Sequence, residues 1–302
     1  MKSVIQTNIT AYPLRSRGKV RDIYDLDAES LLIVTTDRMS AFDVIMSEPI
    51  PYKGVILNQI TLFWMDKFKD IVPNHLIESD VANFPANLAP WQDELEGRSV
   101  IVRKAQPLPI ECIVRGYLTG SGLKDYQATG EVCGHKLPPN LVEASQIEPA
   151  IFTPSTKAEL GTHDENISLA QAATLLGQKR AAQVEALAIK LYTTGRDYSW
   201  QKGIIVADTK FEFGLINDEL ILIDEVLTPD SSRFWPKADY AKGHGQPSFD
   251  KQYLRDWLKT QTWNKQPPAP TLPPEVIKLT QQKYCEAYHI LTGRDLPLPS
   301  TL

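Results

Sequence analysis

The sequence has few cysteines and no long apolar segment. Its 302 residues include three cysteines, Cys112, Cys133 and Cys285, an odd number without the spacing of metal ligands. This pattern disfavours a disulfide framework or a zinc site and favours buried thiols in a reducing compartment. No apolar run approaches the length of a membrane helix, and the N-terminal residues lack the apolar stretch of a signal peptide. We therefore expect a soluble, cytoplasmic protein without a membrane partner.

The sequence also lacks an excess of positive charge. Lys and Arg number 32 against 37 Asp and Glu, so the formal net charge is −5. This balance argues against a nucleic acid as the main partner, because surfaces that bind nucleic acids are strongly basic. Small anionic substrates remain compatible, since local clusters of Lys and Arg determine their binding. The eight-residue Walker pattern and the His-Arg-Asp catalytic loop of kinases are both missing.

The patterns that are present predict an α+β protein with two lobes. Residues 31–36 and 99–103 are rich in β-branched side chains and predict strands. Between them, apolar residues in the segment 55–68 recur at helical spacing. Two prolines in residues 105–109 have no backbone donor, so we expect neither strand nor helix there. We interpret that segment as a short hinge.

The hinge separates a β-rich lobe, residues 1–106, from a larger α/β lobe, residues 107–302. In the second lobe, helices begin and end at recognisable caps. Ser168 and Gln171 have the form of a capping box, and Gly195 is suited to a C-cap. The helices expected in this lobe cover residues 168–176, 178–194, a segment after Ser248, and 274–292.

Residues 202–236 predict two apolar strands joined by a polar turn at 217–219. Successive side chains of a strand point to opposite faces. One face of the first strand therefore carries Asp208, Lys210 and Glu212 in a row. A buried hairpin does not usually carry three charges on one face, so this row is a candidate for function.

The expected register of this hairpin brings two carboxylates together. With a three-residue turn, Ile216 pairs with Leu220, and Glu212 lies opposite Asp224. Like charges in opposite positions are unfavourable, by about 3 kcal/mol at about 5 Å and an effective dielectric constant near 20. Oxygen ligands without a nearby His or Cys favour Mg²⁺, which usually also binds substrate phosphates. A solvated pair of carboxylates at the end of a hairpin is the alternative.

Two glycine-containing turns carry residues that suit phosphate. Gly18 is followed by Lys19 and Arg21, and a hairpin edge would point both cations over a polyphosphate. Further along, a strand that contains Arg115 runs into a glycine-rich turn, and a helix is expected to begin near Ser121. The N-terminus of a helix with an arginine beside it is a phosphate site in physical terms. A surface basic cluster and an ordinary helix cap are the alternatives.

Two further polar segments are candidates. The first is the end of a predicted strand, which carries Asp37, Ser40 and Asp43. These residue types recognise substrates, and they also form caps and turns. The second is the polar loop 152–166, because long loops in compact domains are frequently functional. We interpret His163 in this loop as a hydrogen-bonded histidine, since side chains adjacent in sequence rarely converge on one metal ion.

Taken together, seven blocks resemble the SAICAR synthetase family of purine biosynthesis, in the order found there. They are GKVRDIYDL, TTDRMSAFDVIM, GVILNQITLFW, ECIVRGYLTGSG, FTPSTKAELGTHDENIS, ADTKFEFG and DEVLTPDSSRFWP. They span about residues 18–236, and the C-terminal helices resemble the longer form of the family. The resemblance implies a two-lobed SAICAR-synthase-like fold whose first lobe is similar to the nucleotide-binding lobe of kinases. It also implies a ligase that joins L-aspartate to the carboxylate of carboxyaminoimidazole ribonucleotide, with ATP as co-substrate, through an acyl phosphate.

The resemblance further implies how ATP is bound. Its phosphates are assigned to Gly18, Lys19 and Arg21, its adenine to the 105–109 hinge, and its ribose to Glu111. A kinase-like small-molecule phosphotransferase would share this lobe and is the alternative function. Such an enzyme should carry the His-Arg-Asp loop that is missing here.

Roles in the reaction follow by position in the same way. Glu212 and Asp224 are expected to hold Mg²⁺, and Lys210 to neutralise charge on the transferred phosphoryl group. Asp208 is expected to orient Lys210 or the incoming amine. The remaining assignments are Arg115, Ser121 and Arg233 for the ribonucleotide phosphate, and Asp37, Ser40 and Asp43 for the place where the two other substrates meet.

Overall fold

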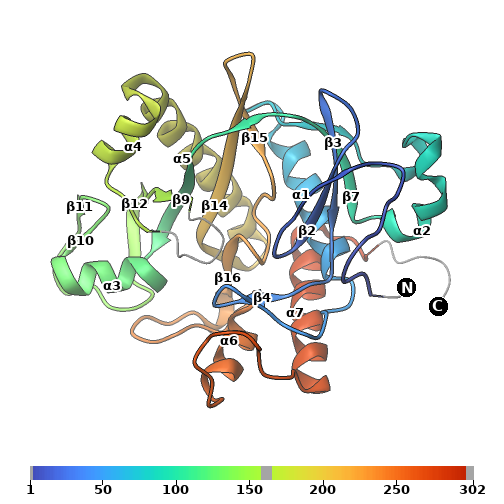
Figure 1. Cartoon of the computed structure of the whole chain (residues 1–302). Helices are drawn as coiled ribbons and strands as arrows, with labels where there is room; N and C mark the ends of the chain where they lie inside the picture. The colour runs from blue at the N-terminus through green and yellow to red at the C-terminus, as the bar shows by residue number, and fades with distance from the viewer. Residues whose placement is uncertain (1–2, 158–164, 297–302) are drawn as a thin grey trace. The chain divides into compact units, whose positions relative to one another are not determined.

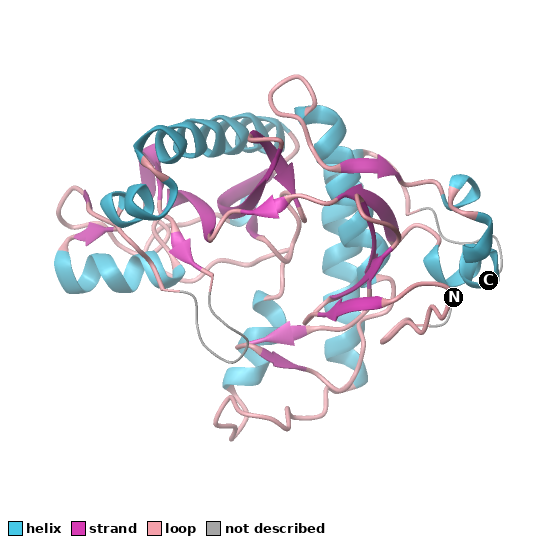
Figure 2. Cartoon of the chain, turned by 45° about the horizontal axis from the view of Figure 1, so that its top comes forward, coloured by secondary structure: helices cyan, strands magenta, loops and turns pink. Residues whose placement is uncertain are grey.

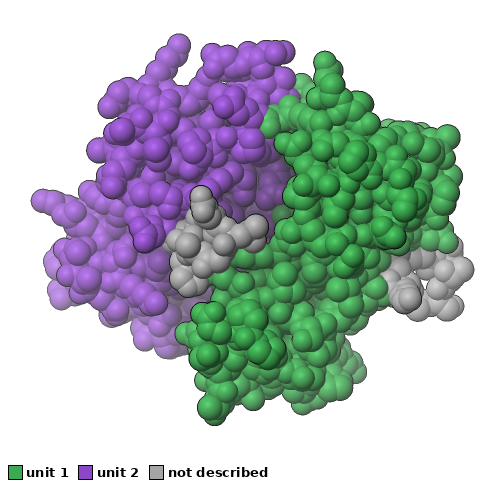
Figure 3. All heavy atoms as spheres, in the orientation of Figure 1, with its two compact units in different colours: residues 1–66, 74–105, 250–302 green, residues 67–73, 106–249 purple. Residues whose placement is uncertain are grey.

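The computed structural model describes residues 3–157 and 165–296, and the chain forms two compact units (Figure 3). Unit 1 comprises residues 1–66, 74–105 and 250–302, and unit 2 comprises residues 67–73 and 106–249. The break after Ala105 lies beside the expected hinge. The C-terminal segment, however, groups with unit 1, whereas the sequence placed it in the second lobe. Within unit 1, the backbone N–H of Leu272 donates to the Glu48 carboxylate at 3.0 Å.

Unit 1 is built on a five-stranded antiparallel sheet with the order β1-β2-β3-β7-β6. The strands are β1 (Leu14–Arg17), β2 (Arg21–Asp25), β3 (Ser30–Thr35), β6 (Leu76–Glu78) and β7 (Ser99–Arg103). β3 and β7 confirm the two strands expected from β-branched content. The core cluster at this sheet contains Ile9, Tyr24, Leu32, Val34, Phe84, Leu88, Leu95 and Ile101.

The helices of unit 1 begin and end largely where the sequence indicates. The segment expected to be helical is α1 (Lys53–Phe68), whose last two residues count with unit 2, and Trp64 and Phe68 are fully buried. The last helix, α7 (Pro274–Thr292), has proline in its first turn and Gly293 in the left-handed conformation as its cap, as expected. The shorter elements are β4 (Ser40–Ala41), β5 (Val44–Ile45), η1 (Val81–Asn83), η2 (Ala86–Trp91), α2 (Gln92–Leu95) and α6 (Gln252–Lys259).

Unit 2 contains a seven-stranded sheet in which β14 is the longest strand. The sheet order is β12-β9-β14-β15; β13 also pairs with β9, and β8 and β16 also pair with β14. Its strands are β8 (Gln106–Pro107), β9 (Ile110–Tyr117), β12 (Gln146–Phe152), β13 (Ser155–Thr156), β14 (Ile204–Ile216), β15 (Glu219–Ile223) and β16 (Ser232–Pro236). A separate hairpin joins β10 (Glu131–Val132) to β11 (His135–Lys136).

The helices of unit 2 are α3 (Gly120–Thr129), α4 (Leu169–Leu176), α5 (Gln178–Gln201) and the 3₁₀ turn η3 (Lys237–Asp239). α5 packs on β14 and β9 and runs along the sheet (Figures 1 and 2). The capping box of Ser168 and Gln171 is present. The expected C-cap at Gly195 is wrong, because α5 continues past it. A Cβ at Gly195 would lie 2.4 Å from Leu227 Cδ1, so close packing explains this glycine.

Two local expectations in unit 2 are also wrong. Residues 106–107 do form a strand, because proline is tolerated where a strand pairs along one edge only. The β14–β15 turn has two residues, Asn217 and Asp218, both with positive φ as a type I′ turn requires. Glu212 therefore lies opposite Ile223 and not opposite Asp224.

Candidate active site

The charged row of β14 lies in the middle of the unit 2 sheet. Asp208 is the direct cross-strand partner of Arg115 on β9 and of Arg233 on β16. Two residues further along, Lys210 pairs with Ile113, so its side chain lies on the face that also carries Asp208 and Glu212. The row thus joins a cluster of arginines to a cluster of lysines and carboxylates.

The arginine cluster is held by one carboxylate oxygen. Arg115 Nη1 donates to Asp208 Oδ2 at 3.1 Å, and Arg233 Nη1 donates to the same oxygen. Arg115 also donates from Nη2 to Ser121 Oγ and from Nε to Thr153 Oγ1, both at 3.0 Å. Arg115 is 2% exposed. Burial lowers the pKa of Arg115 from its usual value, and the charge of Asp208 opposes that shift.

The first turn of α3 lies directly against these arginines. Gly120 has a φ of +59°, and a Cβ there would lie 2.4 Å from Arg233 Nη2. Gly122 is less crowded, with its Cβ position 3.2 Å from Arg115 Cδ. Glycine at 120, with its positive φ, therefore lets the helix terminus approach the two guanidinium groups closely. The arrangement puts two cations, one hydroxyl and a helix N-terminus at one place, which favours a phosphate monoester.

The second cluster surrounds Lys210. Its ammonium forms an ion pair with Glu111 Oε1 and lies 3.7 Å from Glu212 Oε1. Lys157 Nζ lies 2.7 Å from Glu212 Oε2. Burial lowers the pKa of Lys210, but the nearby carboxylates outweigh burial and raise the pKa above its usual value. Lys210 therefore remains a cation at neutral pH.

Glu212 and Asp224, which were expected to hold Mg²⁺, are not directly opposite each other, because Glu212 pairs with Ile223, the residue before Asp224. Asp224 follows β15 and has a φ of +59°, so the chain turns out of the strand there. Its charge still contributes to the raised pKa of Lys210, beside Glu212. Across the part of the chain that the structure describes, no three His, Cys, Asp or Glu side chains gather as a metal centre. Two carboxylates fit Mg²⁺, which takes its other ligands from water and substrate phosphates.

Two roles inferred from the sequence change with this geometry. Asp208 was expected to orient Lys210 or the incoming amine; its carboxylate pairs with Arg115 and Arg233 and not with Lys210. Glu111 was expected to contact a ribose, but its carboxylate pairs with Lys210 and lies 3.5 Å from Ser155 Oγ. Both changes have one cause: cross-strand neighbours come from strands whose pairing the sequence does not reveal.

Lys157 was missed by the sequence reasoning. It lies in the polar loop 152–166, which was identified as a candidate, and its ammonium meets Glu212. The available signal was a lysine in a long polar loop, which is too common to single out one residue. His163, in the same loop, lies outside the described residues.

The candidate residues of unit 1 form a hairpin and its neighbours. β1 and β2 are joined by a turn that contains Gly18 and Lys19, and Arg21 begins β2. Lys19 Nζ forms an ion pair with Asp43, which lies in the two-residue turn between β4 and β5. Ser40 begins β4 and is 7% exposed.

Asp37 does not fit the expected contact with substrate. It is fully buried, and its carboxylate accepts from the backbone N–H groups of Val4 at 2.8 Å and Gly54 at 2.9 Å. Arg98 Nη1 lies 3.0 Å from the same carboxylate. Asp37 therefore ties three segments of unit 1 together, and we exclude it from the substrate contacts.

The expected hinge lines a cavity of about 900 Å³ in unit 2. Residues 106–109 form one wall, and the other walls come from the α4–α5 junction and the β14–β15 turn. Leu175, Leu176 and Leu215 make part of this surface apolar. This cavity lies beside the segment to which the sequence assigns the adenine.

Comparisons with known proteins identify close relatives. The family profile described as SAICAR synthetase matches residues 14–270. A phosphoribosylaminoimidazole-succinocarboxamide synthase of Maridesulfovibrio salexigens is 62% identical over 295 residues, covering 98% of this chain and 99% of the relative. The SAICAR synthase of Saccharomyces cerevisiae, solved in complex with SAICAR, is 47% identical with a TM-score of 0.90 and covers 98% of this chain and 100% of that one. The likeness to the yeast structure confirms the expected fold class.

Proposed function

Because the chain belongs to the SAICAR synthetase family, we propose that the charged row of β14 binds the ribonucleotide at one end and carries out phosphoryl chemistry at the other. The chain is an ATP-dependent C–N ligase with phosphoribosylaminoimidazole-succinocarboxamide synthase activity in de novo purine biosynthesis. Membership of this family confirms the function inferred from the sequence and disfavours the alternative of a kinase-like phosphotransferase.

The spacing of charges along β14 is the observation that carries the proposal. Asp208, Lys210 and Glu212 follow one another at alternate positions on one face. Four residues of extended strand span on the order of 13 Å. The arginine cluster and the carboxylates are therefore separated by the length scale of a nucleotide. A ribonucleotide whose phosphate lies at one end would present its base carboxylate at the other.

Arg115, Arg233 and Ser121 hold the phosphate of the ribonucleotide. Their donors already converge on one place, because Asp208 pairs with both arginines. Asp208 is thus a positioning residue for the two guanidinium groups. Each charge-assisted contact contributes about 1.5–3 kcal/mol to phosphate binding.

Lys210, Glu212 and Asp224 serve the phosphoryl transfer. Glu212 and Asp224 hold Mg²⁺, which when bound neutralises the ATP phosphates as charge develops during transfer. The ammonium of Lys210 stabilises the oxygens of the transferred group. Glu111 fixes the ammonium of Lys210, and we assign this role to it in place of the ribose contact.

The turn that contains Gly18 and Lys19 binds the ATP phosphates, together with Arg21. In this role Lys19 exchanges its exposed partner, Asp43, for a phosphate oxygen. The proposed substrates are ATP, the carboxylated ribonucleotide and L-aspartate. Ser40 and Asp43 stay predictions for the place where the last two meet, and the 105–109 hinge stays a prediction for the adenine.

The cellular location remains a prediction. The three cysteines are free thiols, which favours the reducing cytoplasm over an oxidising compartment. Within residues 3–157 and 165–296, no helix is both long enough and apolar enough to cross a membrane.

An isotope experiment tests the reaction path. In the proposed path, a carboxylate oxygen of the ribonucleotide attacks the γ-phosphorus and ADP leaves. The aspartate amine then displaces phosphate from the acyl phosphate. A ribonucleotide labelled with ¹⁸O in its carboxylate should therefore give inorganic phosphate that contains one ¹⁸O atom. Unlabelled phosphate would refute the acyl phosphate, and release of ADP without aspartate at the full rate would favour a phosphotransferase.

A further inference from the structure

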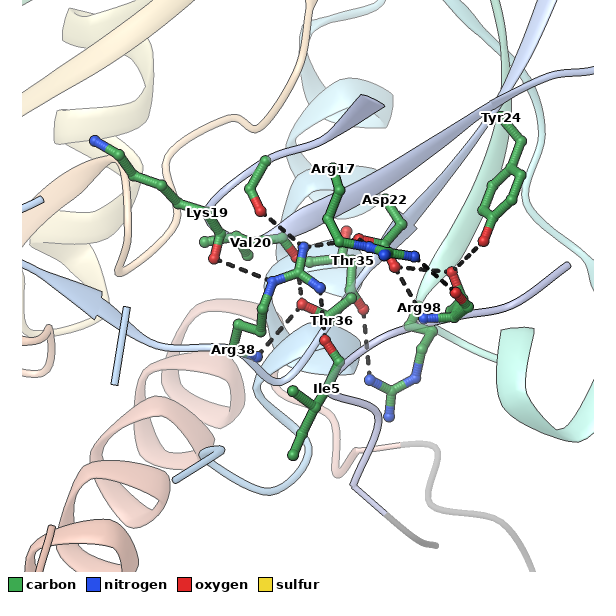
Figure 4. A network of polar contacts seen from close by, with 12 residues as sticks. Ile5, Arg17, Lys19, Val20, Asp22, Tyr24, Thr35, Thr36, Arg38 and Arg98 are labelled. Atoms are coloured by element: carbon green, nitrogen blue, oxygen red, sulfur yellow. Dashed lines mark hydrogen bonds and ion pairs between the residues drawn. The ribbon is translucent and has the colours of Figure 1, made fainter. Parts of the chain in front are cut away.

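We propose that Arg38 is a positioning residue that holds the backbone of the turn 18–20 in a shape that binds phosphate. Its side chain is 6% exposed and lies against this turn, while the side chain of Lys19 extends away from the guanidinium (Figure 4). Arg38 Nη2 donates to the Gly18 carbonyl at 2.9 Å, and Nε donates to the Lys19 carbonyl at 3.4 Å. The inference rests on the proposed role of this turn in binding ATP.

Thr36 holds the next carbonyl of the same turn. The Val20 oxygen accepts from the Thr36 backbone N–H at 2.9 Å and from Thr36 Oγ1 at 2.6 Å. Three consecutive carbonyl groups are therefore bound by donors from residues 36 and 38, at the end of β3. Bonds to every carbonyl along a turn restrict its rotation far more than one bond would.

The orientation of the carbonyls determines the orientation of the N–H groups. A trans peptide is planar, so its C=O and the following N–H point in opposite directions. With the carbonyls of Gly18 and Lys19 held by Arg38, the N–H groups of Lys19 and Val20 point away from it. Adjacent N–H groups that point the same way form a binding place for an anionic oxygen. If these peptides rotated, carbonyl oxygens would face the phosphate and repel it.

Arg38 has a buried counter-charge inside the unit. Its Nη2 lies 2.8 Å from Asp22 Oδ1, and the fully buried Asp22 carboxylate is shared with Arg17, whose Nε lies 3.2 Å from the same oxygen. The Asp22 carboxylate also accepts from the backbone N–H and the hydroxyl of Thr7, each at 2.9 Å. Arg38 Nη1 donates to the Ile5 carbonyl at 2.6 Å, which anchors the other end of the guanidinium. Arg38 therefore acts on ATP through the geometry of the turn and not as an attracting charge.

Calorimetry with the intact protein tests the proposal. Arg38→Met should weaken binding of a non-hydrolysable ATP analogue by about ten- to a hundred-fold, since two charge-assisted contacts are lost. Arg38→Met should bind the ribonucleotide with an affinity within about two-fold of the parent protein's. The affinity of Arg38→Lys for the ATP analogue should lie between those of the parent protein and Arg38→Met, because lysine can satisfy one carbonyl. Arg15→Met is the matched control: Arg15 lies in the same hairpin, is 55% exposed and pairs with Asp25. It should leave both affinities unchanged.

The dependence on salt separates positioning from attraction. Lys19→Ala removes an exposed charge and should reduce the salt dependence of analogue binding, whereas Arg38→Met should leave that dependence unchanged. If Lys19→Ala weakens the analogue and Arg38→Met does not, the positioning role is refuted. If neither variant weakens it, the turn does not bind ATP and the proposed function of the turn fails. Equal loss of both ligands in Arg38→Met would also overturn the inference.

A milder variant covers the case in which Arg38→Met does not fold. Thr36→Val removes the hydroxyl bond to the Val20 carbonyl, together with the 3.4 Å contact that the hydroxyl accepts from the Arg38 backbone N–H, and keeps the size of the side chain. It should weaken the analogue by about three- to ten-fold, as expected for one lost hydrogen bond. An unchanged affinity for the analogue in a folded Thr36→Val protein would refute the role of the held carbonyls.

Discussion

Replacing Arg115 by methionine should weaken binding of the ribonucleotide by about ten- to a hundred-fold. Arg115 contributes a buried guanidinium at the N-terminus of α3, with donors 3.0 Å from Ser121 and 3.1 Å from Asp208. A charge-assisted contact with phosphate contributes about 1.5–3 kcal/mol, and each 1.4 kcal/mol changes affinity about ten-fold. Affinity for ATP should stay nearly unchanged, because its phosphates are assigned to the turn at Lys19 and to the Mg²⁺ of Glu212 and Asp224, and not to the arginine cluster.

The same substitution has a cost in stability that the structure also predicts. Asp208 keeps Arg233 as a partner, so its buried carboxylate is not left alone. The hydroxyl groups of Ser121 and Thr153 each lose a donor. We expect the free energy of unfolding to fall by about 1–3 kcal/mol. Binding should therefore be measured well below the melting temperature, which a thermal scan of the variant provides.

Calorimetric titration of each ligand is the assay, with Arg196→Met as the matched control. Arg196 lies in the same unit and pairs with two exposed carboxylates, those of Glu148 and Asp197, outside the arginine cluster and the cavity beside the hinge. The control should bind both ligands normally. If Arg115→Met weakened ATP and spared the ribonucleotide, the assignment of the two anion sites would be reversed. A structure with the ribonucleotide phosphate against Lys19 would lead to the same conclusion.

Four further substitutions have expected outcomes. Lys19→Ala should raise KM for ATP about ten-fold without changing ribonucleotide affinity, which steady-state kinetics and calorimetry would test. Glu212→Gln and Asp224→Asn should each abolish turnover at saturating Mg²⁺, and near-normal turnover would refute the metal assignment. Neither substitution should raise the melting temperature, because Glu212 already pairs with Lys157. Burial lowers the pKa of His75 from 6.5 to about 3. The unfolded chain therefore binds an extra proton between these values, and stability should fall as pH drops below 6.5, by up to about 1.4 kcal/mol per unit; urea unfolding of His75→Phe between pH 7 and 5 should lose this slope.

Local signals predicted the elements that depend on local chemistry. Pro274 and Gly293 mark the ends of α7, and Ser168 with Gln171 caps α4, because caps act within one turn of helix. The β14–β15 register was missed by one residue. Asn217 and Asp218 both adopt positive φ and form a two-residue turn. The spacing of residues in the sequence does not distinguish this turn from the expected three-residue turn.

Roles that depend on long-range pairing were not predictable in the same way. The row of Asp208, Lys210 and Glu212 followed from strand periodicity alone. That Arg115 would lie beside Asp208, 93 residues away in the chain, depends on β9 pairing with β14. Arg38 lies inside one of the seven blocks but was not singled out, because most of its partners are backbone carbonyls, which every sequence contains.

The segmented make-up of unit 1 has a consequence for the order in which the protein is completed during synthesis. Residues 250–302 belong to this unit, although most of its strands are made first. Unit 2 lies almost entirely within residues 106–249, so all of its strands are translated before the last helix of unit 1. Domains generally fold as they are made, from the N-terminus onward. Here the first unit to begin is the last to be finished, and a chain released at residue 249 would contain every residue of unit 2 but lack the last segment of unit 1.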